Sequence, residues 1–419
     1  MVSKMKLCVV GSGYVGLALA IELGKYFKTI CFDIDKNKIK HLKKNHDINE
    51  EYSKQQITKA KYLSFTSTQD QCNHHDVYFI TVGTPINENN TPNLEAIKSA
   101  TLMVGQLLKK GSVVVYESTV YPGLTEEFCV PILEKASGLK HLSDFYVAYS
   151  PERINPGDKN LTIAKIKKII SADSKASLDI IEPIYKKIIK AGIHVAQSIR
   201  IAEAAKLIEN TQRDLNIALI NELSIIFNRM GIPTKEVIDA AATKWNFMKL
   251  KPGLVGGHCI SVDPYYLTYK SETLGHVPTL IHAGRKINEF MPIHILNRVD
   301  QSQRKGRVLM LGFTFKENCK DIRNTKVFNL YEEAIRRSYE VDIYDPIADK
   351  DEVFHEYGLK LKENISFTDY SIVIYAVNHD CLNKLLRIKN KLAKNSVFFD
   401  IPNAFNHFKN NTNITYMSL

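Results

Sequence analysis

Lys6-Leu7-Cys8-Val9-Val10-Gly11-Ser12-Gly13-Tyr14-Val15-Gly16 is the stretch that decides the fold of this chain. A short apolar run leads into a G-x-G-x-x-G turn, and a helical pattern follows it. In a unit of strand, turn and helix, Gly11 permits the tight turn, Gly13 lets a phosphate approach the backbone, and Gly16 lets the helix pack closely on the strand. The helix N-terminus offers free N–H groups and the positive end of its dipole to an anion. The stretch therefore predicts a phosphate-binding turn at the carboxyl end of a strand.

The next predicted strand, Thr29–Asp33, ends in a carboxylate. Asp33 is placed to accept hydrogen bonds from the adenosine ribose of a dinucleotide and to repel a 2′-phosphate, which favours NAD over NADP. The alternative is a glycine turn in an ordinary α/β protein, but the strand, the helix and the acid together favour the cofactor site. The candidate cofactor residues of this unit are Gly11, Gly13, Tyr14, Val15, Gly16 and Asp33.

The N-terminal half alternates β-rich runs with helical patterns, which predicts a parallel sheet with helices on both faces. The predicted strands are Lys6–Val10, Thr29–Asp33, Val77–Val82, Ser112–Glu117 and Phe145–Tyr149. The stretch Arg200–Met230 has no Gly or Pro and repeats apolar residues at helical spacing, so it predicts one long amphipathic helix. Gly231 and Pro233 supply its stop signal.

The α/β alternation restarts near Arg307 and predicts a second α/β unit. Its predicted elements are the strands Arg307–Gly312, Glu340–Asp345, Ser371–Val377 and Ser396–Asp400 and a helix at Thr325–Arg337. The Asn-rich tail, Asn403–Leu419, is expected to be partly loose. We predict an α/β fold with two Rossmann-like, doubly wound domains joined by a long central helix and a helical middle domain. The expected boundaries are 1–197 for the NAD-binding domain, 198–298 for the central helical domain and 299–419 for the C-terminal α/β domain.

Length and composition restrict the class of protein. A chain of 419 residues with 44% hydrophobic and 24% charged residues fits a globular protein of two or three domains. No apolar run approaches the roughly 18 residues of a membrane helix, and Leu7–Val10 is too short for a signal peptide, so a cytoplasmic protein is expected. The seven cysteines form no C-x-x-C pair and the 13 histidines no H-E-x-x-H, so we expect neither a disulfide framework nor a metal. The net charge of +11 is dispersed, which favours an anionic small substrate over nucleic acid.

Polar residues follow two more of the predicted strands, in Val82-Gly83-Thr84-Pro85 and Glu117-Ser118-Thr119. Ligands bind at the carboxyl ends of strands in open α/β sheets, so Thr84 and Thr119 are candidate cofactor-lining hydroxyls. Each of them taken singly also fits an ordinary strand-end turn. Glu152, after another predicted strand, is either a general base or a loop charge.

A thiol follows paired glycines in Gly256-Gly257-His258-Cys259-Ile260, and Asp263 lies four residues further on. The glycines allow a ligand to approach, and a polar environment would favour the thiolate, although a buried, inert thiol is the alternative. On the long helix Lys206 and Asn210 are four residues apart and share a face. The alternative there is a solvated polar stripe that also includes Glu203 and Arg213.

Together these motifs resemble those of the UDP-glucose/GDP-mannose dehydrogenase family over essentially the whole chain. The segments that match are Val10–Gly16, Thr81–Pro85, Glu117–Gly123, Tyr149–Asp158, Glu203–Thr211, Gly253–Pro264 and Phe313–Arg323. Several motifs in the right order are more specific than any one of them.

The resemblance implies a four-electron oxidation of a sugar C6 hydroxyl to a carboxylate, with two NAD molecules for each sugar. Cys259 matches a nucleophile that forms a thiohemiacetal and then a thioester, which fits the use of covalent catalysis to divide a hard step. Lys206 and Asn210 match groups that stabilise oxyanions. The remaining catalytic matches are Asp263 and Thr119, which position water and protons, and Glu152, a base in thioester hydrolysis.

The resemblance also assigns binding roles. It implies that the C-terminal domain binds the UDP-sugar, that Lys316 contacts the substrate, that Arg323 reaches the NAD, and that the long helix forms a homodimer. The residues expected to contact substrate are Glu152, Arg153, Lys206, Asn210, Gly257 and Lys316. Neither nucleic acid nor membrane insertion is expected.

One departure separates branches of the family. Val262 stands where the UDP-glucose-oxidising branch carries a lysine, and the segments around Glu152 and Cys259 resemble the branch acting on UDP-N-acetylhexosamines. GlcNAc, GalNAc and ManNAc remain open as the sugar, and such products feed bacterial capsule or O-antigen synthesis. The alternatives are a UDP-glucose 6-dehydrogenase, a two-electron hydroxyacid or polyol dehydrogenase that needs no Cys259, and a catalytically silent nucleotide-binding regulator.

Overall fold

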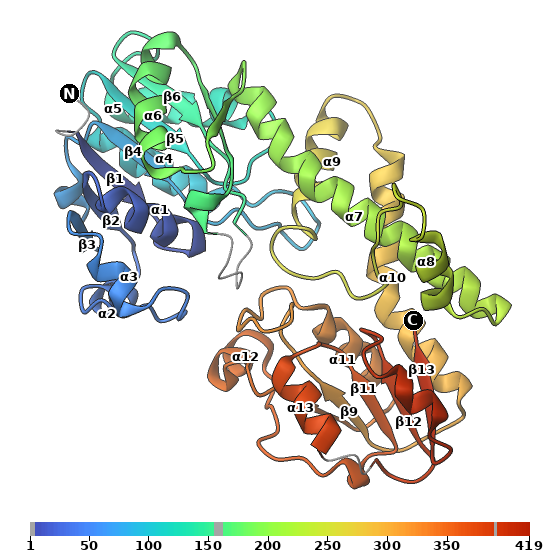
Figure 1. Ribbon diagram of the computed structural model, residues 1–419. Helices are drawn as coiled ribbons and strands as arrows, with labels where there is room; N and C mark the ends of the chain where they lie inside the picture. Colours follow the sequence, from blue (N-terminus) through green and yellow to red (C-terminus); the bar gives the residue numbers. More distant parts are fainter. Residues whose placement is uncertain (1–4, 155–161, 389–391) are drawn as a thin grey trace. The chain divides into compact units, whose positions relative to one another are not determined.

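The computed structural model describes residues 5–154, 162–388 and 392–419, which form two compact units (Figure 1). The first unit comprises Met1–Glu209 and Tyr265–His276, and the second comprises Asn210–Pro264 and Val277–Leu419. Two helices, α7 (Ile199–Met230) and α9 (Asp263–Thr273), have residues in both units. In the described part of the chain no helix is long and apolar enough to cross a membrane.

The first unit is built on a sheet with the strand order β3-β2-β1-β4-β5-β6-β7-β8. Its strands are β1 (Lys6–Val10), β2 (Lys28–Phe32), β3 (Leu63–Thr66), β4 (Val77–Ile80), β5 (Ser112–Tyr116), β6 (Phe145–Tyr149), β7 (Lys168–Ala172) and β8 (Ile193–Val195). Neighbouring strands run parallel, except that β6 and β7 are antiparallel. The order reverses at β1, so the crevice for a ligand lies beyond the carboxyl ends of β1 and β4.

Helices cover both faces of this sheet because side chains alternate along each strand. In β1, Leu7 and Val9 join the core under α1 and α6, whereas Cys8 and Val10 join the core under α4, α5 and the start of α7. The helical elements of this unit before α7 are α1 (Tyr14–Gly24), α2 (Lys36–Leu42), α3 (Lys54–Thr58), η2 (Gln69–Cys72), α4 (Glu95–Leu107), η3 (Thr125–Cys129), α5 (Val130–Ser137), η4 (Ile163–Lys165) and α6 (Lys175–Ile188).

The second unit contains a smaller parallel sheet with the order β10-β9-β11-β12-β13. Its further elements are α8 (Thr234–Ala241), α10 (Thr279–Gln301), β9 (Val308–Leu311), α11 (Lys326–Arg336), β10 (Val341–Tyr344), α12 (Lys350–Tyr357), η5 (Phe367–Asp369), β11 (Ile372–Tyr375), α13 (Asp380–Ile388), β12 (Ser396–Asp400), η6 (Asn406–Asn410) and β13 (Ile414–Ser418). One face packs on α10, α11 and α12, and the other on α13 and η6.

The predicted α/β class, with two Rossmann-like units and a helical middle region, is confirmed, and each predicted strand is present within one or two residues of its expected ends. Four strands, β3, β7, β8 and β13, were not expected. The prediction that the tail is partly loose is wrong for its last residues, because β13 continues the second sheet beside β12. Residues 155–158 of the matching segment Tyr149–Asp158 lie outside the described residues.

A buried polar ladder joins α7 to α10 within the second unit. The helices approach closely at Gly284, where a Cβ atom would lie 2.4 Å from the Leu215 side chain. Beside it the Arg285 guanidinium donates to Asp214 Oδ1 at 2.6 Å, and both residues are at most 2% exposed. Asn288 donates to the same carboxylate at 2.8 Å. Residues of α10 thus supply both side-chain hydrogen bonds to the buried Asp214 carboxylate.

We expect Arg285→Leu to lower the free energy of unfolding by about 3–5 kcal/mol, because it leaves the Asp214 carboxylate buried without its cation. Thermal unfolding measures this. The control is Lys235→Leu, which removes an exposed ion pair with Asp239 on α8 and should leave the melting temperature unchanged. Recovery of stability in the Arg285→Leu/Asp214→Leu double variant would confirm the cause, and equal effects of Arg285→Leu and Lys235→Leu would contradict it.

Candidate functional site

The glycine turn after β1 has the geometry that a phosphate site needs. Gly11 has a φ of +99° and donates from its N–H to Phe32 O at 2.8 Å, so the turn is anchored to β2. A Cβ atom on Gly16 would lie 1.9 Å from Gly11 O, which makes glycine obligatory there. A Cβ atom on Gly13 would meet nothing within 4 Å, so the N-terminus of α1 is open to a ligand.

Asp33 organises this turn through hydrogen bonds to its backbone and side chains. Its Oδ2 accepts from the backbone N–H and the hydroxyl of Ser12, both at 2.7 Å, and its Oδ1 accepts from Asp35 N–H at 3.0 Å. Burial raises the pKa of Asp33, but the hydrogen bonds from Ser12 and Asp35 outweigh burial and hold that pKa below its ordinary value. Asp33 is therefore an anion near neutral pH with acceptor capacity left on Oδ1.

The other cofactor candidates of the first unit lie at the same edge of the sheet. Thr84 and Thr119 follow β4 and β5 and are partly exposed, as are Tyr14 and Val15 at the start of α1. The loops that carry the threonines are tied together, because Ser118 donates from its hydroxyl to Val82 O at 2.7 Å. A dinucleotide at the Gly11 turn would thus meet hydroxyl groups along one sheet edge.

Glu152 lies after β6 in a buried charged cluster. Lys168 Nζ lies 2.6 Å from Glu152 Oε2 and 2.5 Å from Glu117 Oε2, and the Tyr185 hydroxyl donates to the other oxygen of Glu117. Burial raises the pKa of Glu117 to about 7, against the opposing effect of the Lys168 ammonium. Glu152 does lie in a loop, as one of the two interpretations expected, but it is buried there, with an exposed fraction of 6%.

Arg153, the next residue, is anchored by α7. Its guanidinium forms an ion pair with Glu209 at 2.7 Å and donates to Lys167 O at 3.0 Å. The side chain is thereby held beside the first part of α7, within the same unit.

The start of α7 does not carry a solvated polar stripe. Glu203 is fully buried and accepts from the N–H groups of Gly123 at 2.6 Å and Thr125 at 3.1 Å. Lys206 is 8% exposed. The alternative of a solvated face is therefore wrong for both residues, whereas Arg213 is exposed as that alternative expected.

The second unit places Cys259 on a tightly constrained loop. Gly257 has a φ of +90°, and a Cβ atom there would lie 2.7 Å from the Phe315 ring. The Asn324 side chain donates to Gly257 O at 3.0 Å and to Ser261 Oγ at 2.8 Å. Cys259 itself is partly exposed and is therefore not buried, contrary to the alternative of a buried thiol.

Asp263 closes the cysteine loop and meets Asn210. Its N–H donates to Cys259 O at 2.8 Å, where α9 begins, and its carboxylate accepts from Asn210 Nδ2 at 2.5 Å. The sequence could not show that these two candidate residues, 53 positions apart, share a hydrogen bond. The structure thus joins the Asn210 amide to the Asp263 carboxylate, and Asp263 is itself hydrogen-bonded to the backbone of Cys259.

Arg323 and Lys316 lie on the loop between β9 and α11, which packs on the cysteine loop. The Arg323 guanidinium donates to Asp321 Oδ2 at 2.5 Å and lies 3.4 Å from the His258 ring nitrogens. Burial raises the pKa of Asp321, but the hydrogen bond from Arg323 and its charge hold it below the ordinary value. Lys316 is partly exposed, and its carbonyl accepts from the Thr314 hydroxyl at 2.9 Å.

Sequence reasoning missed several members of these sites. Lys168, Tyr185 and Glu117 form the cluster around Glu152, and Asp321 holds Arg323. A lysine at the start of the buried strand β7 was the one signal for the cluster, because a charge inside a buried strand requires a partner. In the described residues no group of His, Cys, Asp and Glu side chains is arranged to hold a metal ion.

Comparison with known proteins identifies the family of the chain. Its residues 5–189, 200–290 and 309–407 match the NAD-binding, central and UDP-binding domains of the UDP-glucose/GDP-mannose dehydrogenase family, to which the chain belongs. The enzyme is thus an NAD-dependent oxidoreductase of nucleotide sugars with a UDP-binding domain.

Individual relatives narrow the resemblance. The chain is 49% identical to a UDP-N-acetyl-D-glucosamine 6-dehydrogenase of Salmonella typhi over 90% of this chain and 91% of that protein. It is 45% identical to protein CapL of Staphylococcus aureus over 96% of both. Among solved structures, a UDP-D-ManNAc dehydrogenase of Pyrococcus horikoshii is similar with a TM-score of 0.88 and 27% identity, covering 99% of each chain.

Cofactor preference should depend on Asp33. We expect Asp33→Asn to raise the KM for NAD and to lower the KM for NADP, because the charge that repels a 2′-phosphate is lost while the side-chain shape is kept. Steady-state rates with both cofactors measure the change. Asp35→Asn, at the exposed N-cap of α2, removes the same charge two residues away and should leave the preference unchanged. A wild-type enzyme that prefers NADP would contradict the role of Asp33.

Proposed function

We propose that this enzyme oxidises the C6 hydroxyl of a UDP-N-acetylhexosamine to the carboxylate through a covalent intermediate on Cys259. The observation that carries the proposal is the cysteine loop, in which a partly exposed thiol follows two obligatory glycines and Asp263, bonded to Asn210, closes the turn. A two-electron dehydrogenase would not need this arrangement.

NAD, when bound at the Gly11 turn, accepts the two electrons of each oxidation, so two molecules are used for each sugar. In the first oxidation the C6 hydroxyl loses its proton to water and C6 loses a hydride, which gives an aldehyde, and the Lys206 ammonium and the Asn210 amide stabilise the alkoxide as it forms. The Cys259 thiolate then adds to the aldehyde carbon and gives a thiohemiacetal. The second oxidation removes a hydride from the carbon of that adduct and a proton from its hydroxyl, which passes to water, and leaves a thioester on Cys259.

Hydrolysis completes the reaction. A water oxygen bonds to the thioester carbon, the carbon–sulfur bond breaks, and Cys259 leaves as a thiolate. Glu152 takes the proton of the attacking water, and Asp263 and Thr119 position that water. Lys316, Arg153 and Gly257 bind the UDP-sugar, and Arg323 reaches the NAD, while the excess positive charge of the chain favours approach of an anionic substrate.

UDP-N-acetylglucosamine is the substrate that the relatives favour among the three N-acetylhexosamines. Two UDP-N-acetyl-D-glucosamine 6-dehydrogenases are 49% and 48% identical to the chain, whereas UDP-N-acetyl-D-mannosamine dehydrogenases are about 30% identical. The name of CapL supports a product destined for bacterial surface polysaccharide. The second candidate, oxidation of UDP-glucose, is disfavoured by Val262 in place of the lysine of that branch.

Three further proposals concern the chain as a whole. The divisions 1–197, 198–298 and 299–419 are proposed as the NAD-binding, central and UDP-sugar-binding domains, and the three family matches fall inside them. A cytoplasmic location fits the free cysteines of the structure, because unpaired thiols are usual in a reducing compartment. A homodimer is the third.

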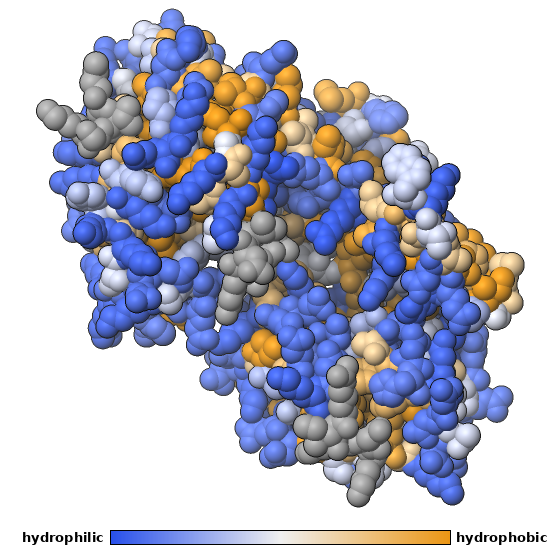
Figure 2. Space-filling view, in the orientation of Figure 1, coloured by the Kyte–Doolittle hydropathy of each residue, from blue (hydrophilic) through white to orange (hydrophobic). Residues whose placement is uncertain are grey.

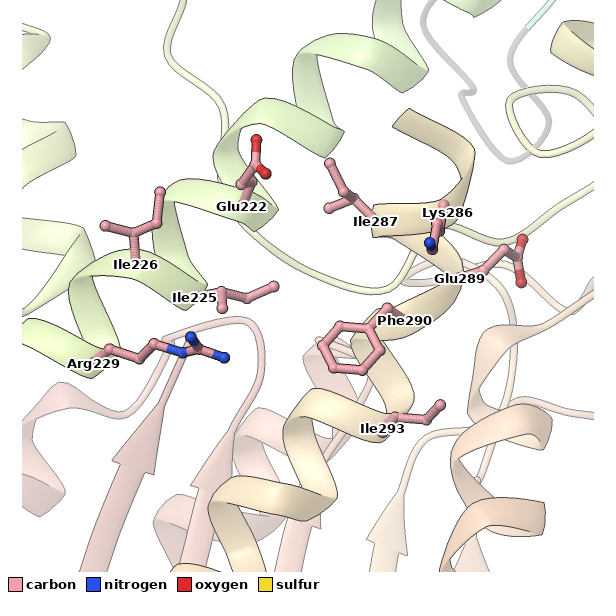
Figure 3. A pocket seen from close by; sticks show the side chains of 9 residues that line it. All are labelled: Glu222, Ile225, Ile226, Arg229, Lys286, Ile287, Glu289, Phe290 and Ile293. Atoms are coloured by element: carbon pink, nitrogen blue, oxygen red, sulfur yellow. The ribbon is translucent and has the colours of Figure 1, made fainter. Parts of the chain in front are cut away.

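The homodimer rests on an apolar stripe of α7. Ile208, Leu219, Ile226 and Met230 are between 43% and 62% exposed, and their spacings of eleven, seven and four residues return to one helix face. Within the second unit this face borders a 570 Å³ groove between α7 and α10, where Ile225 and Phe290 point toward each other (Figure 3). Apolar side chains also gather at the surface near the end of α7 and α8 (Figure 2). A patch of this kind is typical of a covered interface.

Substitution of Cys259 should separate the first oxidation, which gives the aldehyde, from the second, which gives the acid. We expect the wild type to release two NADH and one uronate for each UDP-N-acetylglucosamine, with lower kcat/KM for UDP-glucose because a pocket that bonds the acetamido group rejects an analogue without it. Cys259→Ala should form only traces of aldehyde and no acid, because no thioester can form. NADH counting with product mass spectrometry measures both. The control is Cys381→Ala, an exposed thiol on α13, which should behave as the wild type.

Two results would contradict the proposed function. Conversion of sugar to acid by Cys259→Ala at nearly the wild-type rate, with two NADH, would exclude the covalent route. Faster turnover of UDP-glucose than of every UDP-N-acetylhexosamine would move the enzyme to the other branch of the family.

The proposed dimer should depend on the stripe. We expect Ile226→Glu to raise the dissociation constant of the dimer by about 10-fold or more, because the substitution buries a charge without a partner. Ile335→Glu on α11 is the matched control, since Ile335 is 45% and Ile226 43% exposed, and it should remain dimeric. Light scattering measures the mass. A wild type that is monomeric and fully active at micromolar concentration would contradict the dimer.

A further inference from the structure

Lys168 is an unusual residue for the inside of a sheet. It begins β7, its side chain is 2% exposed, and its ammonium lies between two carboxylates, with Glu117 Oε2 at 2.5 Å and Glu152 Oε2 at 2.6 Å. Glu117 is also buried and accepts from the Tyr185 hydroxyl of α6. With both carboxylates ionised, the cluster carries one more negative than positive charge.

Stability does not explain this cluster. Burying charges costs more than their attraction returns in most proteins, and apolar side chains of similar volume are often as stable or more so. The neighbouring strand residues Ile169 and Ile170 are apolar and buried, so the sheet accepts such side chains here. A second carboxylate on one ammonium adds a further charge to desolvate. The arrangement therefore points to a role for the charges themselves.

Glu152 is held from both ends of its carboxylate. Oε2 receives the Lys168 ammonium, and Oε1 accepts from the backbone N–H groups of Arg153 at 2.7 Å and Ile154 at 2.8 Å. The three donors come from β7 and from the turn that follows β6, so the plane of the carboxylate is fixed by two separate elements. A base fixed in this way keeps one orientation toward a reacting water.

We propose that Lys168, together with Glu117, is a positioning pair that orients Glu152 and sets how far the charge of its carboxylate is neutralised during hydrolysis of the thioester. The proposal rests on the proposed function, which gives Glu152 that role. Lys168 and Glu117 are buried and act through Glu152. The Tyr185 hydroxyl donates to Oε1 of Glu117, the oxygen that does not face Lys168, and holds it in place.

Protonation of Glu117 gives this pair a pH dependence. The groups that face Glu117 are Lys168 on β7, Glu152 after β6 and Tyr185 on α6, and burial raises the pKa of Glu117 well above its ordinary range. Below that pKa the Lys168 ammonium has one carboxylate partner, Glu152, and neutralises its charge. Above it the ammonium is shared between two carboxylates, so more of the negative charge of Glu152 remains to attract a proton of the attacking water. Hydrolysis should therefore quicken as the pH rises through the pKa of Glu117.

The first test follows the acyl-enzyme. Full-length enzyme is mixed with UDP-N-acetylglucosamine and NAD, NADH is recorded in the first turnover, and intact-protein mass reports any sugar acyl group on Cys259. We expect Glu152→Gln and Lys168→Met to release two NADH per site in a burst and then to hydrolyse the adduct about 10²-fold more slowly, since loss of orientation costs about that much. Lys168→Arg should restore most of the rate. Lys190→Met, an exposed lysine, is the control and should resemble the wild type.

The second test uses Glu117→Gln, which keeps the side-chain shape and leaves a one-to-one pair between Lys168 and Glu152. The rate of adduct breakdown is measured between pH 5.5 and 9. We expect the wild-type rate to rise through the pKa of Glu117 and the corresponding step to be absent from Glu117→Gln, which stays at the low-pH level. A merely structural role for the cluster would change the melting temperature and leave the shape of this profile unaltered.

The outcomes separate the two proposals. An adduct that accumulates in Glu152→Gln while folded Lys168→Met and Glu117→Gln turn over with the wild-type pH profile would overturn the positioning pair and leave the proposed function standing. If Lys168→Met does not fold, an unchanged profile in Glu117→Gln alone overturns it. A wild type that forms no acyl adduct and no acid would overturn the proposed function itself.

Discussion

Both sheets depend on one contact, in which a carboxylate at the end of a strand accepts hydrogen bonds from the backbone just after the glycine that ends the neighbouring strand. In the first unit Asp33 Oδ2 accepts from Ser12 N–H at 2.7 Å, and in the second Asp345 Oδ2 accepts from Phe313 N–H at 2.6 Å. The preceding glycines have φ angles of +99° and +90°, which require glycine. The same device thus fixes where the chain leaves the sheet in each unit and which way the following loop runs.

Asp33 and Asp345 differ in how many lone pairs of the carboxylate remain free to accept a hydrogen bond from a ligand. Asp33 keeps acceptor capacity on Oδ1, whereas Asp345 is surrounded: its Oδ1 accepts from Ile347 and Ala348 N–H groups and its Oδ2 faces His379. Burial raises the pKa of Asp345, but His379 and the backbone donors lower it to about 2. An acid so fully bonded has no capacity left for a ribose. In the second unit a long loop follows Gly312, carries Lys316 and Arg323, and packs on the cysteine loop.

Local rules predicted the elements whose signals are contained in a short window. The turn from Gly11 to Gly16 is an example, since the positive φ of Gly11 and the close approach of Gly16 to Gly11 O both arise within six residues. The α7 helix is another, because its apolar period runs unbroken. The strand β13 could not be predicted in this way. Its five residues lie in an Asn-rich tail that gives no strand signal, and its stability comes from pairing with β12, a contact that local composition does not contain.

The site follows the same division. Cys259 and Gly257 were recognisable because the chemistry and the steric need are adjacent in sequence. The bond between Asn210 and Asp263, and the convergence of Glu117, Glu152 and Lys168, arise only when separate strands and helices meet.

Buried charge occurs at two very different kinds of position, and the difference is informative. Asp214 and Arg285 form a buried ion pair between two helices, in which Arg285 and Asn288 both donate to Oδ1 of Asp214. The second partner of Arg285, Glu289, is 39% exposed and also pairs with Lys326, so Asp214 is the fully buried carboxylate of this group and the contacts fix the packing. The cluster at Lys168 has one cation for two carboxylates. One of these, Glu117, directly follows the carboxyl end of β5. A fold gains nothing from an uncompensated buried charge, since burial penalises it whatever its neighbours. Such a charge persists where the protein needs a group whose protonation can change without the backbone moving, and the carboxyl edge of the first sheet is where that need arises.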